Sequence, residues 1–153
     1  MNDYENEYEY EEDQYEEDTH EVMAAYSFII GGKAEFTIKN VTSGKKFKYK
    51  VKKSKYDNVF YISVKRGNDY EYAGSLNIKK GVYSKGKNGI IDSNHPAIKG
   101  LLYALRKGDN PLPRPMIMLH HGKCACCSKK LDDELSVSRG FGPICYERIF
   151  GRK

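Results

Sequence analysis

Two neighbouring segments of the chain alternate between apolar and polar residues, and this pattern constrains the fold more than any other feature of the sequence. Alternation with a period of two is typical of β-strands that are buried on one face only. The segments span residues 35–41 and 46–52, with a turn signal at 42–44 between them. The apolar positions are Phe36, Ile38, Phe47, Tyr49 and Val51. The sequence therefore predicts a β-hairpin whose other face carries Lys46, Lys48, Lys50 and Lys52.

Two further strands and one helix are predicted downstream. Residues 59–64 and 70–78 have strand composition, and the Gly-rich residues 79–95 should form a loop that can hold a short strand at 89–91. The helix that follows should take Ser93 or Asn94 as its cap, and its apolar stripe comprises Ile98, Leu101, Leu102 and Leu105. The predicted fold class is α+β, with an antiparallel β-meander of about four strands covered by one helix and followed by a small C-terminal module.

The charges are segregated along the chain. Residues 1–22 carry 11 acidic groups and no Lys or Arg, so the other 131 residues hold 21 − 11 = 10 acidic groups against 26 basic ones. An acidic, tyrosine-rich segment with few aliphatic residues is typical of a disordered tail, which we assign to residues 1–23. Residues 24–110 form the predicted basic β-rich domain, and residues 111–153 a proline-rich link and the C-terminal module. The excess of positive charge on the body predicts a polyanionic partner.

Four cysteines lie between residues 124 and 145, and their spacing indicates a metal site. Cys124 and Cys127 have the two-residue separation with which a tight turn directs two thiolates at one ion. Cys145 follows a Gly-Pro pair that starts a helix, so its sulfur should lie in the first helical turn. His121 is the predicted fourth ligand, and His120 is the alternative. The module is therefore predicted to hold a structural Zn²⁺ in a closed tetrahedral shell and to end in a short helix.

Other interpretations of the cysteines stay open. The thiols could be free groups near a surface turn, and Cys126 is either a bystander or a substitute for Cys124 or Cys127. A catalytic pair of Cys145 and His121 is less favoured, because the sequence shows no third orienting residue and no oxyanion loop. No other acid, base or nucleophile arrangement can be assembled, so we expect a protein that is not an enzyme.

The C-terminal segment resembles a family of uncharacterised phage and plasmid proteins, whose signature is H-x-G-x-C-x-x-C-G-R-x-L followed by G-x-G-P-x-C. The matching residues are His120, Gly122, Cys124, Cys127, Leu131, Ser136, Gly140, Gly142, Pro143 and Cys145. Ser128 and Lys129 replace the usual Gly-Arg pair, and residues 132–134 replace a Thr-x-Pro. Short upstream segments extend the likeness, so that it covers residues 27–147. The resemblance implies an origin in a mobile element and a zinc-bearing β domain, but no activity.

The lysine-rich face of the hairpin indicates contact with nucleic acid. Nine lysines fall within residues 33–55, and aromatic residues follow them. This is the composition of a sheet that neutralises phosphates and stacks bases. The predicted contact residues are Lys46, Lys48, Lys50, Lys52, Tyr61 and Arg66. The alternative is a solvated strand face, on which lysines only prevent edge-to-edge pairing.

The leading hypothesis is a non-enzymatic nucleic-acid-binding accessory protein of a phage or plasmid, located in the cytoplasm of the host cell. The second hypothesis is a phage factor that binds and inhibits or modulates a host protein through the acidic tail or the zinc module. The tail itself could compete with nucleic acid, mimic DNA or only keep the chain soluble. No apolar run approaches the roughly 18 residues needed to span a bilayer, and no small-molecule substrate is indicated.

Overall fold

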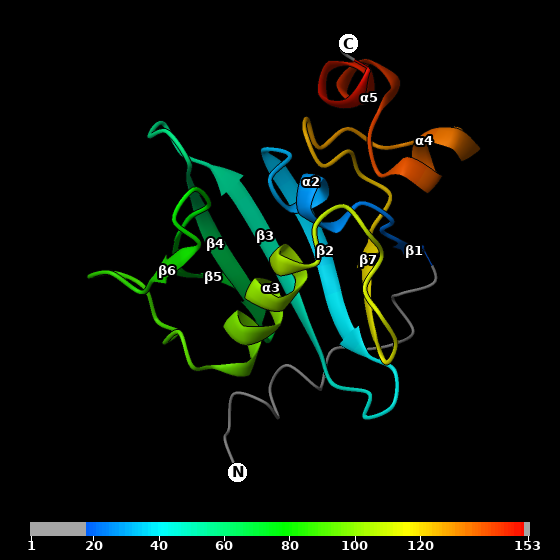
Figure 1. Ribbon diagram of the computed structural model, residues 1–153. Coiled ribbons are helices and arrows are strands. Elements are labelled where there is room, and N and C mark those ends of the chain that lie inside the picture. Colours follow the sequence, from blue (N-terminus) through cyan, green and yellow to red (C-terminus); the bar gives the residue numbers. More distant parts are fainter. Residues whose placement is uncertain (1–17, 152–153) are drawn as a thin grey trace.

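The computed structural model describes residues 18–151, which are built around an antiparallel sheet of seven strands (Figure 1). The strand order across the sheet is β1-β7-β2-β3-β4-β5-β6. The strands are β1 (His20–Glu21), β2 (Lys33–Asn40), β3 (Lys46–Lys53), β4 (Val59–Arg66), β5 (Asp69–Asn77), β6 (Val82–Ser84) and β7 (Met116–His120). The helices are α2 (Ala25–Ile29), α3 (Pro96–Arg106), α4 (Glu134–Arg139) and α5 (Pro143–Phe150). None of the helices between residues 18 and 151 is long and apolar enough to cross a membrane.

The alternation of the sequence sets the register of the central hairpin. Phe36 pairs with Tyr49 and Ile38 with Phe47, so the apolar residues of β2 and β3 share one face. The rings of Phe36 and Tyr49 stack with their centroids 5.1 Å apart. β4 and β5 follow beside β3, each antiparallel to the strand before it. The predicted antiparallel meander is confirmed as the central part of a larger sheet.

Three strands extend this meander beyond the four that the sequence predicts. β7 pairs with β2 on the side away from β3, and β1 pairs with the outer edge of β7. β6 pairs with β5 at the opposite edge, whereas residues 89–91, where a short strand was predicted, have no strand structure. β1, β7 and β6 have two, five and three residues, too few for a period-two pattern to distinguish them from a loop.

Helix α3 covers the apolar face of the central strands (Figure 1). Its predicted stripe is confirmed, since every member is buried or packed against the core: Ile98, Leu101, Leu102 and Leu105. The hydroxyl of Tyr49 donates a hydrogen bond to the carbonyl of Ala97 over 2.7 Å, which ties β3 to the first helical turn. The cap is His95, whose Nδ1 accepts the amide of Ala97, and not the predicted Ser93 or Asn94.

The C-terminal segment packs against the same core as the sheet. Phe28 of α2 lies between the two, with its ring centroid 6.1 Å from that of Phe36 and 5.9 Å from that of Phe141. The turn that carries the cysteines meets the chain just before β2 at Gly31, where a Cβ would lie 2.8 Å from the carbonyl oxygen of Ala125. Glycine permits this close approach of two backbones. The C-terminal module therefore lies on the sheet instead of swinging on a free link.

The tail predicted for residues 1–23 falls mainly outside the described residues. Its last part does not, because His20 and Glu21 form β1 and Val22 is buried. Arg114 donates to both carboxylate oxygens of Glu21, over 2.9 and 3.2 Å, and so joins β1 to the segment before β7. Among residues 18–151 the sheet therefore begins at residue 20, inside the segment predicted to be the tail.

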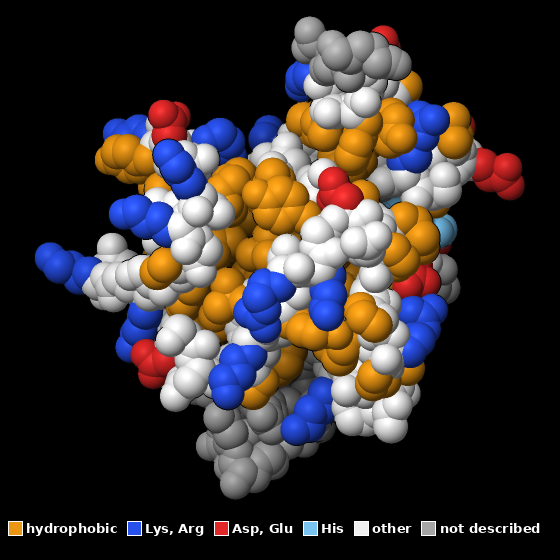
Figure 2. Space-filling view, in the orientation of Figure 1, with side chains coloured by type: hydrophobic (Ala, Val, Ile, Leu, Met, Phe, Trp, Pro, Cys, Tyr) orange, Lys and Arg blue, Asp and Glu red, His pale blue; other side chains and the backbone are white. Residues whose placement is uncertain are grey.

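The two faces of the sheet differ in character. Helices α2 and α3 lie on the face toward Phe36 and Tyr49, and on this side of the molecule apolar side chains gather beside α3, with Lys and Arg around them (Figure 2). The residues of β3 that alternate with Tyr49 point to the other face, and they include Lys48, Lys50 and Lys52. The alternation thus separates an apolar, covered face from a cationic one.

Candidate metal centre and cationic face

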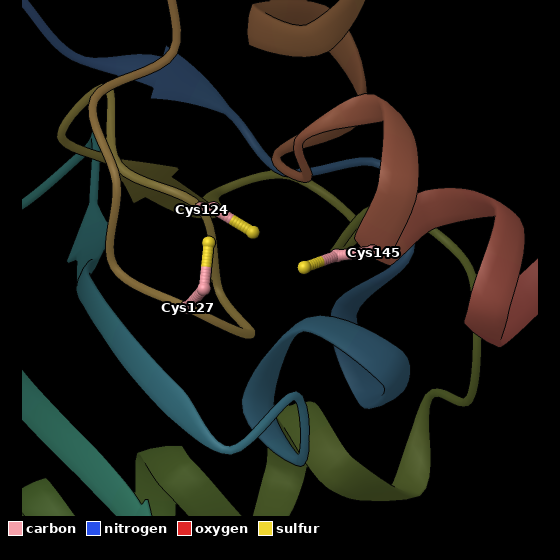
Figure 3. A group of neighbouring side chains, drawn as sticks. All are labelled: Cys124, Cys127 and Cys145. Carbon is pink, nitrogen blue, oxygen red and sulfur yellow. The ribbon is translucent and has the colours of Figure 1, made fainter.

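Three of the four cysteines converge on one point (Figure 3). The Sγ atoms of Cys124, Cys127 and Cys145 all lie within 4.8 Å of one another. Zn–S bonds of about 2.3 Å place the sulfurs of a tetrahedral zinc site about 3.8 Å apart, so a small closing movement would fit the ion. We call these three residues the cysteine cluster, and they could hold a metal ion.

A tight turn directs the first two thiols of the cluster. The amide of Ser128 donates to the carbonyl of Cys124 over 2.9 Å, and the amide of Cys124 donates to the carbonyl of Lys129 over 2.8 Å. The amide of Cys126 donates to the Sγ of Cys124 over 3.4 Å, the N–H···S contact expected of this spacing. Ser128 closes the turn with a φ of 70°, at a position where the phage and plasmid family has glycine.

The third thiol comes from the start of α5. Gly142 is the N-cap and Pro143 occupies the first turn, as the Gly-Pro pair predicts. Cys145 therefore lies where the helix dipole favours a thiolate. Just before this, Gly140 ends α4 with a φ of 83°, and a Cβ there would lie 2.8 Å from the ring of Phe28. The G-x-G-P-x-C motif thus fixes the path that brings Cys145 to the turn.

The thiols of the cluster differ in acidity. Burial raises the pKa of Cys124, but the amides of Gly142, Cys127 and Cys126 together with the Cys127 thiol outweigh it, so the net pKa is lowered. Burial and the adjacent thiols of Cys126 and Cys124 raise the pKa of Cys145. A bound cation reverses the second effect, because it stabilises all three thiolates at once. The three sulfurs could therefore hold a cation, on which all three thiols would be deprotonated.

The predicted alternative ligand, His120, does not lie in the cysteine cluster. It is fully buried on the apolar face of the sheet, with its ring stacked on Phe28 at a centroid distance of 5.7 Å. Both ring nitrogens are engaged, since Nε2 lies 2.7 Å from the carbonyl oxygen of Val137 and Nδ1 accepts the amide of Gly122 over 3.0 Å. Burial lowers the pKa of His120, so a neutral ring that donates from Nε2 fits all these contacts.

His121, the predicted fourth ligand, points to the other face of the sheet. Its Nε2 lies 3.0 Å from Oγ1 of Thr37 on β2. Neighbouring residues of an extended chain point to opposite faces of the sheet, so His120 and His121 diverge. The first cysteine, Cys124, lies three residues farther along the chain. The structure thus brings together three of the four predicted ligands and places both histidines in other contacts.

The cysteine cluster borders a pocket of about 490 Å³. All three cysteines line this pocket, together with basic and acidic side chains: Lys129, Lys130, Arg148, Asp132 and Asp133. Asp133 is also the cap of α4, where its carboxylate accepts the amide of Ser136 over 3.0 Å, and this hydrogen bond lowers its pKa. No spacing rule in the sequence points to Arg148, which only the turn of α5 brings beside the cysteines.

Comparison with known proteins places the cysteine cluster in a recognised sequence unit. Residues 119–150 match a family described as a family of unknown function, DUF6011. The matched segment holds all four cysteines, α4 and α5. The upstream segments that resemble the phage and plasmid family lie outside this match. No curated protein and no solved structure matches the chain.

The predicted nucleic-acid residues do not all share one surface. Lys50, Lys52 and Tyr61 are exposed, and Lys52 pairs with Tyr61 across β3 and β4. Lys48 is partly buried on the same face, whereas Lys46 is only 2% exposed. Arg66 lies an even number of residues from the buried Ile62 and Val64 of β4, so it lies on their face of the sheet and points away from the lysines. It forms an ion pair of 3.4 Å with Glu71.

Two tyrosines that the sequence did not assign to this surface join it. A β-bulge in β5 shifts the register between Ile62 and Ser63, and beyond it Tyr72 lies opposite Ser63. The rings of Tyr61 and Tyr72 meet edge to face, with their centroids 6.0 Å apart. We define the cationic face by these tyrosines and the accessible lysines of β3: Lys48, Lys50, Lys52, Tyr61, Tyr70 and Tyr72.

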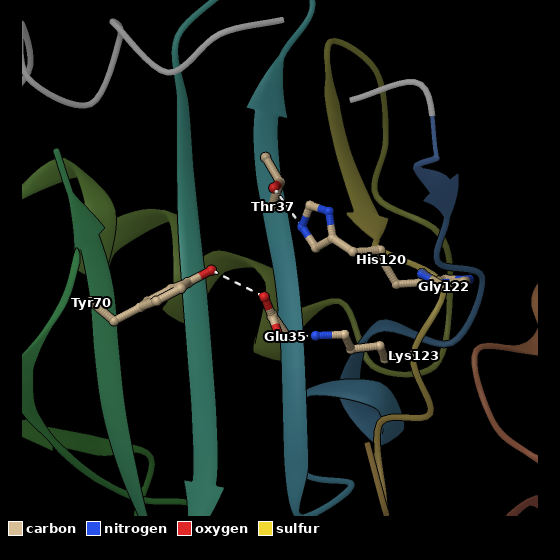
Figure 4. A network of polar contacts seen from close by, with 7 residues as sticks. Glu35, Thr37, Tyr70, His120, Gly122 and Lys123 are labelled. Carbon is tan, nitrogen blue, oxygen red and sulfur yellow. Dashed lines mark hydrogen bonds and ion pairs between the residues drawn. The ribbon is translucent and has the colours of Figure 1, made fainter. Parts of the chain in front are cut away.

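A polar row holds the middle of the cationic face in place (Figure 4). The hydroxyl of Tyr70 donates to Glu35 over 3.4 Å, and Nζ of Lys123 lies 3.6 Å from the other carboxylate oxygen of Glu35. Nζ of Lys50 lies 4.4 Å from the centre of the Tyr70 ring, within range of a cation–π contact. Because Lys123 immediately precedes Cys124, this row connects the cationic face with the turn of the cysteine cluster.

Proposed function

We propose that the protein is a non-enzymatic nucleic-acid-binding accessory protein of a phage or other mobile element, in which a zinc ion holds the C-terminal segment on the sheet. The observation that carries the proposal is the cationic face, where exposed Lys50 and Lys52 lie beside Tyr61, which is 38% exposed. Phosphates would contact the lysines, and bases would stack on the tyrosine rings. The mobile-element origin rests on the resemblance of the C-terminal signature.

The spacing of the lysines supports contact with a phosphate backbone. Lys48, Lys50 and Lys52 are successive residues on one face of β3, about 6.6 Å apart along a strand that rises 3.3 Å per residue. Such a row contributes a charge-dependent and sequence-independent affinity, which weakens as salt rises. Lysine is a point charge without the planar donor fork of arginine, so this surface favours backbone contact over readout of base edges.

The tyrosines support binding of single strands. Tyr61 and Tyr72 stand edge to face on adjacent strands, and Tyr70 is held by Glu35 and Lys50. Stacking of a base on an aromatic side chain contributes about 1–3 kcal/mol and tolerates any base, because every base has a π-face. A duplex keeps its bases stacked on one another, so we expect single-stranded nucleic acid to bind more tightly than duplex.

The chemistry of the cysteine cluster supports zinc as the metal. Zn²⁺ binds thiolate ligands well, whereas the hard cations Mg²⁺ and Ca²⁺ prefer oxygen ligands. Cys124 and Cys127 belong to the turn after β7, and Cys145 to α5, so one ion would join two elements that share few aliphatic side chains. In this role the ion stabilises the C-terminal segment and, through Lys123 and Glu35, supports the cationic face.

The test of the proposed function is a fluorescence-anisotropy titration of labelled single-stranded DNA, duplex DNA and RNA with the zinc-loaded full chain at two salt concentrations. The double variant Lys50→Glu and Lys52→Glu should weaken single-strand binding by about tenfold or more and reduce its salt dependence. The control, Lys79→Glu with Lys80→Glu, makes the same change in net charge at two exposed lysines beyond β5 and should have a much smaller effect. Equal losses in the two variants would contradict a specific cationic face.

A variant that lacks residues 1–17 separates the roles of the acidic segment. The cut stops before β1, so all seven described strands of the sheet are retained. Tighter binding by this variant at low salt would identify the segment as a competitor for the cationic face. No binding by either chain would overturn the nucleic-acid proposal.

One observation favours the second candidate function, binding to a host protein. Ile144 in α5 is 74% exposed and Leu135 in α4 is 55% exposed, although both are large and apolar. Contiguous exposed apolar patches mark protein-docking surfaces, and these two side chains would contribute to such a patch. Under this alternative, Ile144→Ser would abolish capture of a host protein while Lys50→Glu with Lys52→Glu would leave it unchanged.

A further inference from the structure

The cysteine cluster supplies three donors where zinc prefers four. In structural sites Zn²⁺ is almost always four-coordinate, and sites with three protein ligands keep a fourth position for water or another molecule. We infer that a metal ion held by Cys124, Cys127 and Cys145 keeps one exchangeable position, which faces the adjoining pocket and accepts an imidazole nitrogen or a thiolate sulfur from outside the chain. This inference rests on the metal centre of the proposed function.

Neither histidine can complete the shell without giving up its present contacts. His120 uses Nε2 for the carbonyl of Val137 and Nδ1 for the amide of Gly122, and it is fully buried between Phe28 and His20. His121 contacts Thr37 on the cationic face, on the opposite side of the sheet from the ring of His120. Neither residue lines the pocket into which the three sulfurs open.

Cys126 is the nearest competing donor within the chain. Its thiol approaches that of Cys145, but it does not belong to the group of sulfurs that all lie within 4.8 Å of one another. Its Sγ instead accepts a hydrogen bond from Nη1 of Arg148 over 3.7 Å, and its amide donates to Cys124. Cys126 also does not line the pocket, so its sulfur lies beside the cluster and not at the open side.

The carboxylates that line the pocket are placed for other roles. Asp133 caps α4 through the amide of Ser136, and Asp132 does not join the three sulfurs in the metal-binding group. Zinc also binds nitrogen and sulfur donors in preference to a lone exposed carboxylate next to three thiolates. Among residues 18–151, no further side chain is therefore placed to close the open side of the cluster, which is left to a donor from solvent or from another molecule.

The charge of the pocket suits such an exchangeable position. Three thiolates on a divalent cation leave a net charge of −1. The basic residues that line the same pocket, Lys129, Lys130 and Arg148, outnumber its two acidic ones, Asp132 and Asp133. These cations offset the charge of the metal–thiolate group and lower the electrostatic cost of adding an anionic donor such as a thiolate. The volume of about 490 Å³ is large enough to admit an imidazole ring or a cysteine side chain.

The test uses X-ray absorption of the zinc-loaded full chain and visible spectroscopy of the cobalt-substituted chain. We expect three sulfur neighbours at about 2.3 Å and one nitrogen or oxygen neighbour at about 2.0–2.1 Å. Imidazole should shift the cobalt absorption bands saturably. The same response should persist in His121→Ala, Cys126→Ser and Asp132→Asn, because none of these residues holds the fourth position.

Four sulfur neighbours that fall to three in Cys126→Ser would overturn the inference in favour of a closed shell completed by Cys126. Loss of the nitrogen or oxygen neighbour in His121→Ala or Asp132→Asn, or a cobalt spectrum that imidazole does not change, would overturn it as well. Metal content is measured in parallel by mass spectrometry. A chain that binds no zinc would reject the metal centre itself, whereas nucleic-acid binding is assessed separately in the anisotropy titration.

Discussion

The central strands and the cysteine-bearing segment are held together by different forces. Strands β2–β5 and helix α3 share a core of fully buried side chains that includes Phe36, Tyr49, Ile62 and Leu101. Between residues 121 and 150 the fully buried large side chains are reduced to Phe141, and the segment depends on backbone hydrogen bonds and three adjacent thiols. The comparison teaches that apolar burial holds the sheet, whereas the C-terminal segment has fewer buried apolar side chains and carries three thiols that could hold a metal ion.

Removal of a cysteine ligand should produce the largest difference between the two regions. Cys145→Ser removes one of three thiolates, and because structural zinc sites contribute about 10–16 kcal/mol in small peptides, we expect zinc affinity to fall by more than about 100-fold. Hydrogen exchange should then rise across residues 121–150 while β2–β5 stay protected. Cys126→Ser is the matched control and should retain both zinc and protection. Equal loss of protection in both regions would contradict the comparison.

Truncation of a core aromatic should affect the sheet most. Phe36 is fully buried between Tyr49 and Phe28, so Phe36→Ala should lower the free energy of unfolding by about 3–5 kcal/mol. The loss should appear in urea unfolding with and without zinc, because the core does not depend on the metal. Leu135→Ala, at a position 55% exposed, should change stability by less than about 0.5 kcal/mol. A loss below about 1 kcal/mol at Phe36 would show that the sheet is held by something else.

Acid should weaken the junction of the two regions through His120. Burial lowers its pKa in the folded chain below the 6.5 of an exposed histidine, so the unfolded chain binds the proton more readily. The contribution of the neutral ring is therefore complete above pH 6.5 and is lost as the pH falls from 6.5 through the lowered folded pKa. An NMR titration of the ring should give a midpoint below 6.5, and urea midpoints should decline less with acid in His120→Gln. A midpoint above 6.5 would contradict this assignment.

Backbone strain gives the smallest expected effect, and it too should differ between the regions. Ser128 has a φ of 70° in the cysteine turn, and Asn58 has a φ of 64° before β4. Asparagine tolerates this left-handed conformation better than serine, so Ser128→Gly should stabilise the chain by about 1 kcal/mol and Asn58→Gly by less. Thermal unfolding of both variants measures the difference. A larger gain at Asn58 would contradict it.

Features that depend on near neighbours in the chain were predictable. The period-two alternation of residues 35–52 sets both the register of β2 with β3 and the separation of apolar from cationic side chains. The i, i+3, i+4, i+7 stripe of α3 and the two-residue spacing of Cys124 and Cys127 are local patterns as well. Each follows from geometry within one strand, helix or turn, which the residue order specifies directly.

Features that depend on distant partners were not predictable in the same way. The added strands are short and are stabilised by the strands that they pair with. The residues of β7 show no period-two pattern of their own, and only their pairing with β2 makes them a strand. The bulge in β5 turns Tyr70 and Tyr72 to the cationic face, whereas an unbroken strand would turn them to the core with Leu76. The face on which Arg66 lies depends on the same packing of β4 against the core.

The sequence by itself determined the antiparallel meander, the helix that covers it and the turn that presents two thiols, because each is encoded within a few successive residues. Only the tertiary structure decided where the histidines point. His120 enters the core and His121 the cationic face because β7 pairs with β2 in one register, and this pairing joins residues 76 to 84 positions apart. The tertiary structure likewise placed the sulfur of Cys145 beside the turn and, within residues 18–151, left three donors, not four, around the centre.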